Sequence, residues 1–218
     1  VAAVVDDVER AHALGGVRVI GENAFKNNDY ILNVICPDSL EEIGYRAFYD
    51  CDNLQSVSLP ETLKVINEGA FYYCENLKTL GHTDDGVLPK GLTSIGVKAF
   101  YFCKALEGDL VIPEGVTSLS AGIFYNAFAL TSITIPDTVT SMDANGDQFA
   151  NCTAVTSVKL SKNLTELPKT AFFTCKSLKH LPDLSNVTSV GTSCFAGCAA
   201  LEEMVIPESL TFVGTNAF

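Results

Sequence analysis

The chain has 218 residues, of which 14 are Lys or Arg and 26 are Asp or Glu, so its formal net charge is −12. A content of 47% apolar residues with 13 Phe excludes intrinsic disorder, because a disordered chain has few large apolar side chains and many charges. An acidic chain repels phosphate groups, so nucleic acid is not an expected partner.

Residues 1–16 match no later part of the chain. Their apolar spacing predicts an amphipathic helix that serves as an N-terminal cap or linker. Charged residues interrupt this segment, so it is not a secretory signal, and no run of about 18 uncharged apolar residues predicts a membrane span. Because the chain starts without Met and stops within a repeat, we expect it to be a fragment of a longer protein.

Residues 17–218 repeat one unit about eight and a half times. The unit reads A-F-x-x-C-x-x-L-x-x-V-x-I-P-x-x-L-x-x-I-G, and its Phe recurs at intervals of 23, 23, 29, 24, 25, 23, 23 and 23 residues. A fixed period of this length is typical of solenoid proteins. The nine Phe residues are Phe25, Phe48, Phe71, Phe100, Phe124, Phe149, Phe172, Phe195 and Phe218.

Each unit predicts two short strands and one turn. The alternating V-x-I segment that ends at Pro predicts a strand, the L-x-x-I-G segment predicts a second one, and the spacing in x-x-A-F-x-x-C favours a helical turn. A strand of about four residues cannot bury its own apolar face, so neighbouring units must stack around one core.

These blocks, recurring in one order over roughly residues 17–218, resemble the BspA-like (Treponema-type) leucine-rich repeat family. The resemblance implies an α/β repeat solenoid, a right-handed and horseshoe-like array with short parallel strands and helical turns. It also implies adhesion or protein recognition rather than catalysis. The sequence departs from the pattern at Ser161, which replaces Pro, and at 181–184, where we expect disturbed strand pairing.

Insertions predict surface loops, the longest of them within 81–86. There His82, Asp84 and Asp85 offer cation ligands, although a solvated turn is the favoured interpretation.

Eight cysteines would suggest disulfides in an extracellular chain. Six of them, however, recur three residues after the repeat Phe. Equivalent residues of stacked strands lie about 4.8 Å apart, whereas a disulfide needs Cβ atoms about 3.8 Å apart. We therefore predict eight free, buried thiols. No paired Cys-x-x-Cys motif indicates zinc, and we predict no metal site and no cofactor.

Ser157, His180 and Glu203 share one repeat position and would stand side by side on adjacent strands. A hydrolase is thus a weak alternative. A flat sheet face supplies no oxyanion hole, so we expect solvent-facing polar residues, no catalytic residue and no enzyme activity.

A column of aromatic residues follows the repeat Phe. Its members either pack between units or form an exposed stripe of the kind that marks recognition surfaces. The carboxylates that follow Pro are good turn residues, but stacked in register they would also form an acidic edge for calcium or a basic partner. The candidate binding residues are Tyr49, Tyr72, Tyr73, Tyr101, Phe102 and Tyr125.

The favoured function is a non-enzymatic recognition or adhesion module of a cell-surface or secreted protein, with a protein or glycan ligand. The alternative is a cytoplasmic scaffold for protein–protein interactions, which free thiols and the missing signal favour.

Overall fold

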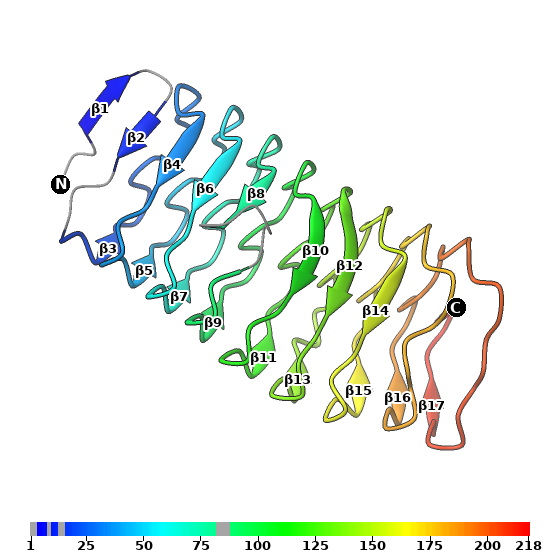
Figure 1. The fold of residues 1–218 in the computed structure, drawn as a ribbon. Helices are drawn as coiled ribbons and strands as arrows, with labels where there is room; N and C mark the ends of the chain where they lie inside the picture. Colours follow the sequence, from blue (N-terminus) through cyan, green and yellow to red (C-terminus); the bar gives the residue numbers. More distant parts are fainter. Residues whose placement is uncertain (1–3, 8–9, 13–15, 82–87) are drawn as a thin grey trace.

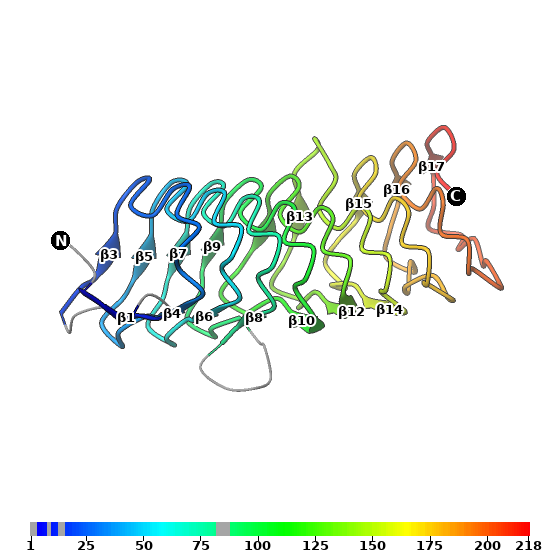
Figure 2. The ribbon, with the colours of Figure 1, turned by 90° about the horizontal axis from the view of Figure 1, so that it is seen from above.

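The computed structural model describes residues 4–7, 10–12, 16–81 and 88–218. The chain winds into an elongated stack of about eight coils (Figure 1), with one coil per repeat. Successive coils present two rows of strands, joined by turns and loops (Figure 2). The predicted repeat solenoid with short parallel strands is confirmed.

The first row of strands comes from the V-x-I segments. The first apolar residue of the V-x-I segment, such as Val57 or Ile133, is buried, and the residues beside it in the strand are more exposed. Pairing is parallel and in register, for example Val34 with Val57 and Ile133 with Val158. One sheet contains β2 (Arg10–His12), β4 (Asn33–Ile35), β6 (Ser56–Ser58) and β8 (Thr79–Leu80), and the next contains β10 (Gly108–Val111), β12 (Leu130–Thr134) and β14 (Ser157–Lys159).

The second row comes from the L-x-x-I segments, as predicted. Its strands also pair in parallel and form the lower row of arrows in Figure 1. They are β3 (Val19–Ile20), β5 (Glu42–Ile43), β7 (Val65–Ile66) and β9 (Ser94–Ile95), then β11 (Ser118–Leu119) and β13 (Ser141–Met142), and finally β15 (Glu166–Leu167), β16 (Ser189–Val190) and β17 (Phe212–Val213).

The repeat Phe side chains stack through the centre of the array. Neighbouring rings are nearly parallel, with centroids 5.2 Å apart for Phe48 and Phe71 and 5.3 Å apart for Phe71 and Phe100. The second pair spans the longest insertion, so the added residues leave the stack undisturbed. Burying one such side chain contributes about 1.5–3 kcal/mol, and the neighbours on both sides supply the burial.

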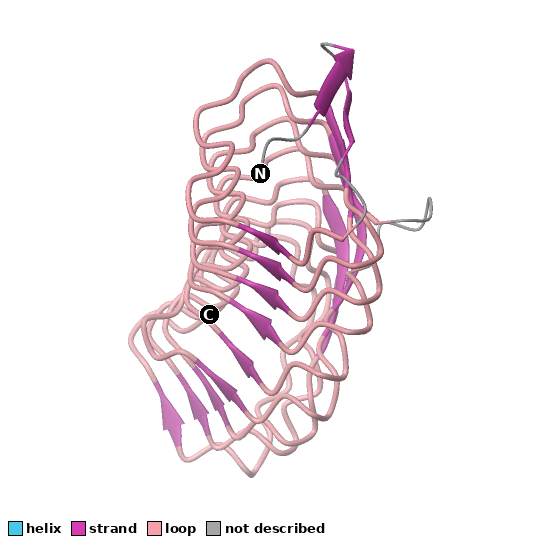
Figure 3. Cartoon of the chain, turned by 90° about the vertical axis from the view of Figure 1, so that its left-hand side faces the viewer, coloured by secondary structure: helices cyan, strands magenta, loops and turns pink. Residues whose placement is uncertain are grey.

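The predicted α/β class and its helical turns are wrong, because the described residues contain no helix (Figure 3). From Phe25 to Phe195, the turn around each repeat Phe has a left-handed residue two positions before the Phe and another two positions after it. Around Phe48 these are Arg46, with φ 50°, and Asp50, with φ 58°. An α-helix needs negative φ at every residue, so these two positions interrupt it.

The turn divides its backbone N–H groups between two uses. The Ala47 N–H donates within its own coil to the Gly44 carbonyl (3.2 Å), whereas the Phe48 N–H donates to the Ala70 carbonyl of the next coil (2.8 Å). In an α-helix the N–H groups after the first turn all donate within the helix, so they would not alternate between the two uses. The inter-coil bonds therefore replace the helix.

The helix predicted over residues 1–16 is also not observed. The described residues there form β1 (Val4–Asp7) and β2, an antiparallel pair, and β2 continues in parallel onto β4. The segment thus extends the first sheet by strand pairing.

We predict that Phe71→Ala destabilises the protein by about 3–5 kcal/mol, because Phe71 is fully buried and its removal opens a cavity between two rings. Denaturant unfolding measures the change. Tyr30→Ala, at a residue that is 79% exposed, should change stability by less than about 0.5 kcal/mol. Equal effects of the two variants would contradict the stacked core.

Candidate functional site

Six aromatic side chains beside the Phe stack form a surface that we call the aromatic ridge: Tyr49, Tyr72, Tyr73, Tyr101, Phe102 and Tyr125. All six are half-buried. They lie on the turns that follow the repeat Phe residues, so the coil spacing sets the distance between them. These are the candidate residues of the sequence section, which were expected either to pack between units or to form an exposed stripe. Their rings pack against one another between coils and remain partly exposed.

The first row of the ridge is a stack of four tyrosines. Ring centroids lie 5.1 Å apart for Tyr49 and Tyr72, 4.8 Å for Tyr72 and Tyr101, and 4.6 Å for Tyr101 and Tyr125, with interplanar angles of 15°, 19° and 9°. The faces of the inner rings are therefore occupied by neighbouring rings. What the row presents outward is ring edges and hydroxyl groups.

The second row consists of Tyr73 and Phe102. The Tyr73 ring meets the Tyr72 ring edge to face at 4.5 Å, and the Tyr73 and Phe102 centroids lie 4.9 Å apart. Both residues are left-handed, with φ 61° and 63°. Other repeats place smaller residues at the same position, and most of these are Asn, Asp or Gly, which tolerate the left-handed conformation best: Asn27, Asp50, Asn126, Asn151, Thr174 and Gly197.

A bulky side chain in the left-handed region costs about 1–2 kcal/mol. The turn itself does not need an aromatic residue there, since the other repeats form it without one. Strain that the fold does not require is a mark of functional positions. Tyr73 and Phe102 are accordingly the strongest site candidates in the ridge.

Four cations flank the ridge. Lys26 and Arg46 lie 5.3 Å and 5.1 Å from the centroid of the Tyr49 ring, Lys98 lies 5.2 Å from that of Tyr101, and Lys104 lies 5.5 Å from that of Phe102. These distances allow cation–π attraction. Lys104 also forms an ion pair with Glu75 at 2.7 Å.

These cations were not predicted from the sequence. The sequence does contain a pattern that indicates them: Arg46 and Lys98 occupy the same repeat position, two residues before the Phe.

The ridge ends where small or polar residues take over its positions. Ala150 occupies the position that follows Tyr125 in the stack, and Asn151 donates a side-chain hydrogen bond to Asn126 at 2.7 Å. At the other end, Lys26 takes the position before Tyr49. The ridge thus spans four coils.

Burial raises the pKa of the Tyr72 hydroxyl to about 12, with smaller contributions from the neighbouring Tyr73, Tyr101 and Tyr49. Burial also raises the pKa of the Tyr101 hydroxyl. Both hydroxyls therefore stay protonated at neutral pH and can donate hydrogen bonds to a partner.

The prediction of eight free, buried thiols is confirmed. The repeated thiol donates to the carbonyl of the Phe in the preceding coil, for example from Cys51 to Phe25 at 3.0 Å and from Cys74 to Phe48 at 3.0 Å. Burial raises the pKa of Cys36 to about 12. The thiols are thus buried donors, and no group of three His, Cys, Asp or Glu residues suited to a metal occurs in the described part of the chain.

The other candidate groups are only partly brought together. His180 and Glu203 pair across adjacent coils, but β14, which carries Ser157, is the last strand of its sheet, so Ser157 does not pair with His180. Two of the carboxylates after Pro bind backbone instead of forming an open acidic edge: Glu61 accepts from the Lys90 N–H (2.8 Å) and Asp137 from the Lys162 N–H (2.9 Å). The candidate cation ligands His82, Asp84 and Asp85 lie outside the described residues.

Comparison with known proteins identifies the repeat. The sequence profile of the BspA type leucine rich repeat region (6 copies) matches residues 8–107 and 83–181. No curated protein matches the chain.

Three solved structures are similar. A leucine-rich repeat protein of T. pallidum is 22% identical, with TM-score 0.60 over 90% of this chain and 80% of that one. A leucine-rich repeat protein of Bacteroides ovatus is 23% identical, with TM-score 0.54 over 93% and 67%. The pneumococcal vaccine antigen PcpA is 24% identical, with TM-score 0.53 over 69% and 36%. These likenesses show the fold.

The tyrosine stack predicts a pH dependence. Because the pKa of Tyr72 is about 12 in the folded state and about 10 in an unfolded chain, the folded state holds the proton more tightly, and its stability should fall as pH rises from about 10 to about 12. Denaturant midpoints measured across this range should fall less for Tyr72→Phe than for the wild type. An equal fall in both would contradict the assignment to Tyr72.

Proposed function

Because the chain belongs to the BspA type leucine rich repeat family, whose folds are generally non-catalytic binding scaffolds, we propose that it is a non-enzymatic recognition module that binds a protein through the aromatic ridge. The observation that carries the proposal is the pair Tyr73 and Phe102. Both are aromatic, half-buried and held in a costly left-handed conformation that the other repeats form with small or polar residues.

The composition of the ridge supports a protein partner. Tyr, Phe and Arg are enriched where protein interfaces concentrate their binding energy. The ridge is also rigid, since each inner tyrosine is fixed between two neighbours, so binding would cost little side-chain entropy.

A glycan is the second candidate, and the geometry favours it less. Binding of sugars by aromatic residues uses an open ring face. In the tyrosine stack the inner faces are covered by neighbouring rings, and the outer face of Tyr49 lies next to Lys26 and Arg46.

For location we propose the cell surface or the extracellular medium, with a role in adhesion, which the family favours. No helix in the described residues is long and apolar enough to cross a bilayer. The eight free thiols favour the alternative, a cytoplasmic scaffold, because thiols persist in reducing compartments. Fractionation of the producing cells with an antibody against the chain separates the two.

We predict that the double variant Tyr73→Asn with Phe102→Asn loses binding while keeping its fold, because Asn is the residue used at the same position elsewhere in the array. Peptides selected against the wild type from a random display library should bind the double variant at least about tenfold more weakly, as expected when two interface anchors are removed.

Tyr30→Asn is the matched control, since Tyr30 is an exposed tyrosine outside the ridge. It should leave peptide binding unchanged, and the double variant should match the wild type in thermal unfolding within a few degrees. Selected peptides that bind wild type and double variant equally would contradict the proposal. A glycan array bound by wild type but not by the double variant would reassign the ridge to sugars.

A further inference from the structure

The first row of strands breaks after β14, as the irregular sequence at 181–184 predicted. Thr134 pairs with Lys159 in the ladder, and Pro182 comes one repeat after Lys159. Proline has no N–H, so it cannot donate to the carbonyl of Val158 across the gap. The sheet formed by β10, β12 and β14 ends here for that reason.

After the break, the side chains that face the core and those that face solvent are exchanged. In regular coils the residue two positions before the repeat Pro is half-buried, as at Ser58 and Thr134, and the next residue is buried, as at Leu59 and Ile135. In this coil Pro182 is buried and Asp183 is exposed. A shift of one residue in strand facing reverses which side chains reach the core, and this segment does not pair with β14, although β15 and β16 still pair in the second row.

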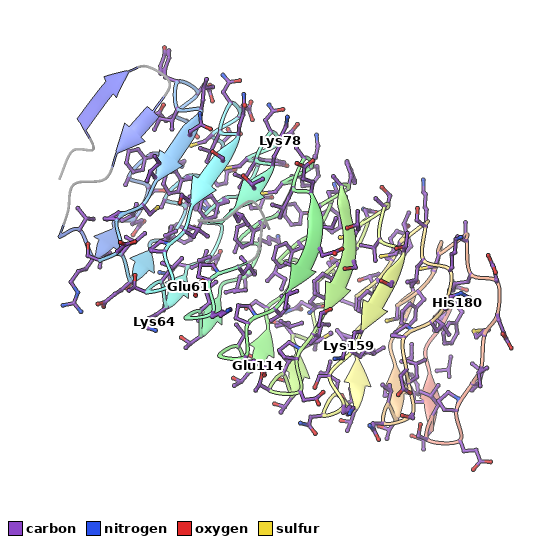
Figure 4. All side chains as sticks on the ribbon, viewed as in Figure 1. Glu61, Lys64, Lys78, Glu114, Lys159 and His180 are labelled. Carbon is purple, nitrogen blue, oxygen red and sulfur yellow. The ribbon has the colours of Figure 1, made fainter. Side chains whose placement is uncertain are left out.

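The break opens a hollow between β14 and residues 183–187, with a volume of about 300 Å³. Its walls include the apolar residues Leu160, Leu164 and Val187, and its polar lining includes Lys159, Lys162, Asp183 and Asn186. A second hollow of about 380 Å³ lies on the other side of the same segment and is lined by His180, Glu203 and Val205 among others. In Figure 4, Lys159 and His180 are labelled on this face of the array.

A backbone donor in the first hollow lacks its usual acceptor. In the preceding pair of coils the Ile135 N–H donates to the Lys159 carbonyl at 2.9 Å. One repeat later the donor is Leu160, and within residues 88–218 its N–H forms no such bond, although Leu160 is only 7% exposed. An N–H on the wall of this hollow is free to donate to a ligand oxygen.

The charges around this donor favour an anion. Neither Lys159 nor Lys162 forms an ion pair with a residue that the structure describes. The Asp183 carboxylate is already engaged, since it accepts from the Ser185 N–H at 2.9 Å. Two ammonium groups and one carboxylate give the lining a net charge of +1, so one ligand carboxylate would make it neutral.

We propose that this hollow, the Leu160 pocket, binds the carboxylate of a small ligand, with the Leu160 N–H and the ammonium groups of Lys159 and Lys162 as its donors. The volume is at the lower end for ligand sites and suits a group as large as one sugar or one amino-acid residue. An acidic sugar and an acidic residue of a peptide share this chemistry. The proposal is independent of the aromatic ridge.

The test follows backbone amide signals of the full chain by NMR during titration with glucuronate, with N-acetylaspartate amide and with neutral glucose. The Leu160 amide should shift and saturate with at least one carboxylate and stay unchanged with glucose. Stronger binding of glucuronate would indicate an acidic sugar, and stronger binding of the aspartate derivative would indicate an acidic peptide.

Lys159→Gln and Lys162→Gln should each weaken binding about tenfold, as expected for one charge-assisted bond. Lys176→Gln, at an exposed lysine outside the pocket, is the control and should bind as the wild type does.

A variant that repairs the repeat tests the cause of the pocket. Pro182→Thr with Asp183→Ile copies the Ile-Thr-Ile pattern of residues 133–135 and restores the missing N–H. It should close the hollow, abolish the Leu160 shift and raise the denaturant midpoint.

The proposal is overturned if no carboxylate shifts the Leu160 amide, if glucose shifts it equally, or if the two lysine variants bind as tightly as the wild type. Persistent binding by a folded repair variant would overturn it as well.

Discussion

The structure depends on backbone hydrogen bonds that run from each coil to the next. Around the repeat Phe residues from Phe25 to Phe195, N–H groups leave their own coil, as the Phe48 N–H does when it donates to the Ala70 carbonyl. A single coil leaves these groups unpaired and exposes both faces of its Phe ring. Buried backbone groups without partners are costly, so no coil is stable without neighbours. The Phe stack, the thiol bonds and the two rows of strands all follow from the same register.

This register also produces the candidate surface. Residues at one repeat position form a column with a spacing near 5 Å, so a tyrosine after successive Phe residues must become a stacked row. Tyr73 and Phe102 are themselves left-handed residues of their turns, and their side chains pack beside that row. Where the register fails, at Pro182, a pocket opens instead. Regular coils thus present an extended surface, and the irregular coil presents a concave one.

The periodicity of the sequence was sufficient to predict the solenoid, both rows of strands, the buried thiols and the disturbance near residue 183. It failed for the turn around each Phe, because apolar residues three and four apart fit a helix as well as this turn. What separates them is the sign of φ at residues such as Arg46 and Lys98, whose side chains give no sign of a left-handed backbone. The ridge residues were predicted by their column, but their half-burial and the flanking cations depend on packing between coils.

Native-state hydrogen exchange tests the inter-coil bonding most directly. The amides of Phe48, Phe124 and Phe172, which donate to the next coil, should exchange only through cooperative opening of several coils, at least about a thousandfold more slowly than an unprotected amide. Comparable protection of all three would support one continuous array. Exchange of these amides at the rate of an unprotected chain, while the protein remains folded, would contradict the account.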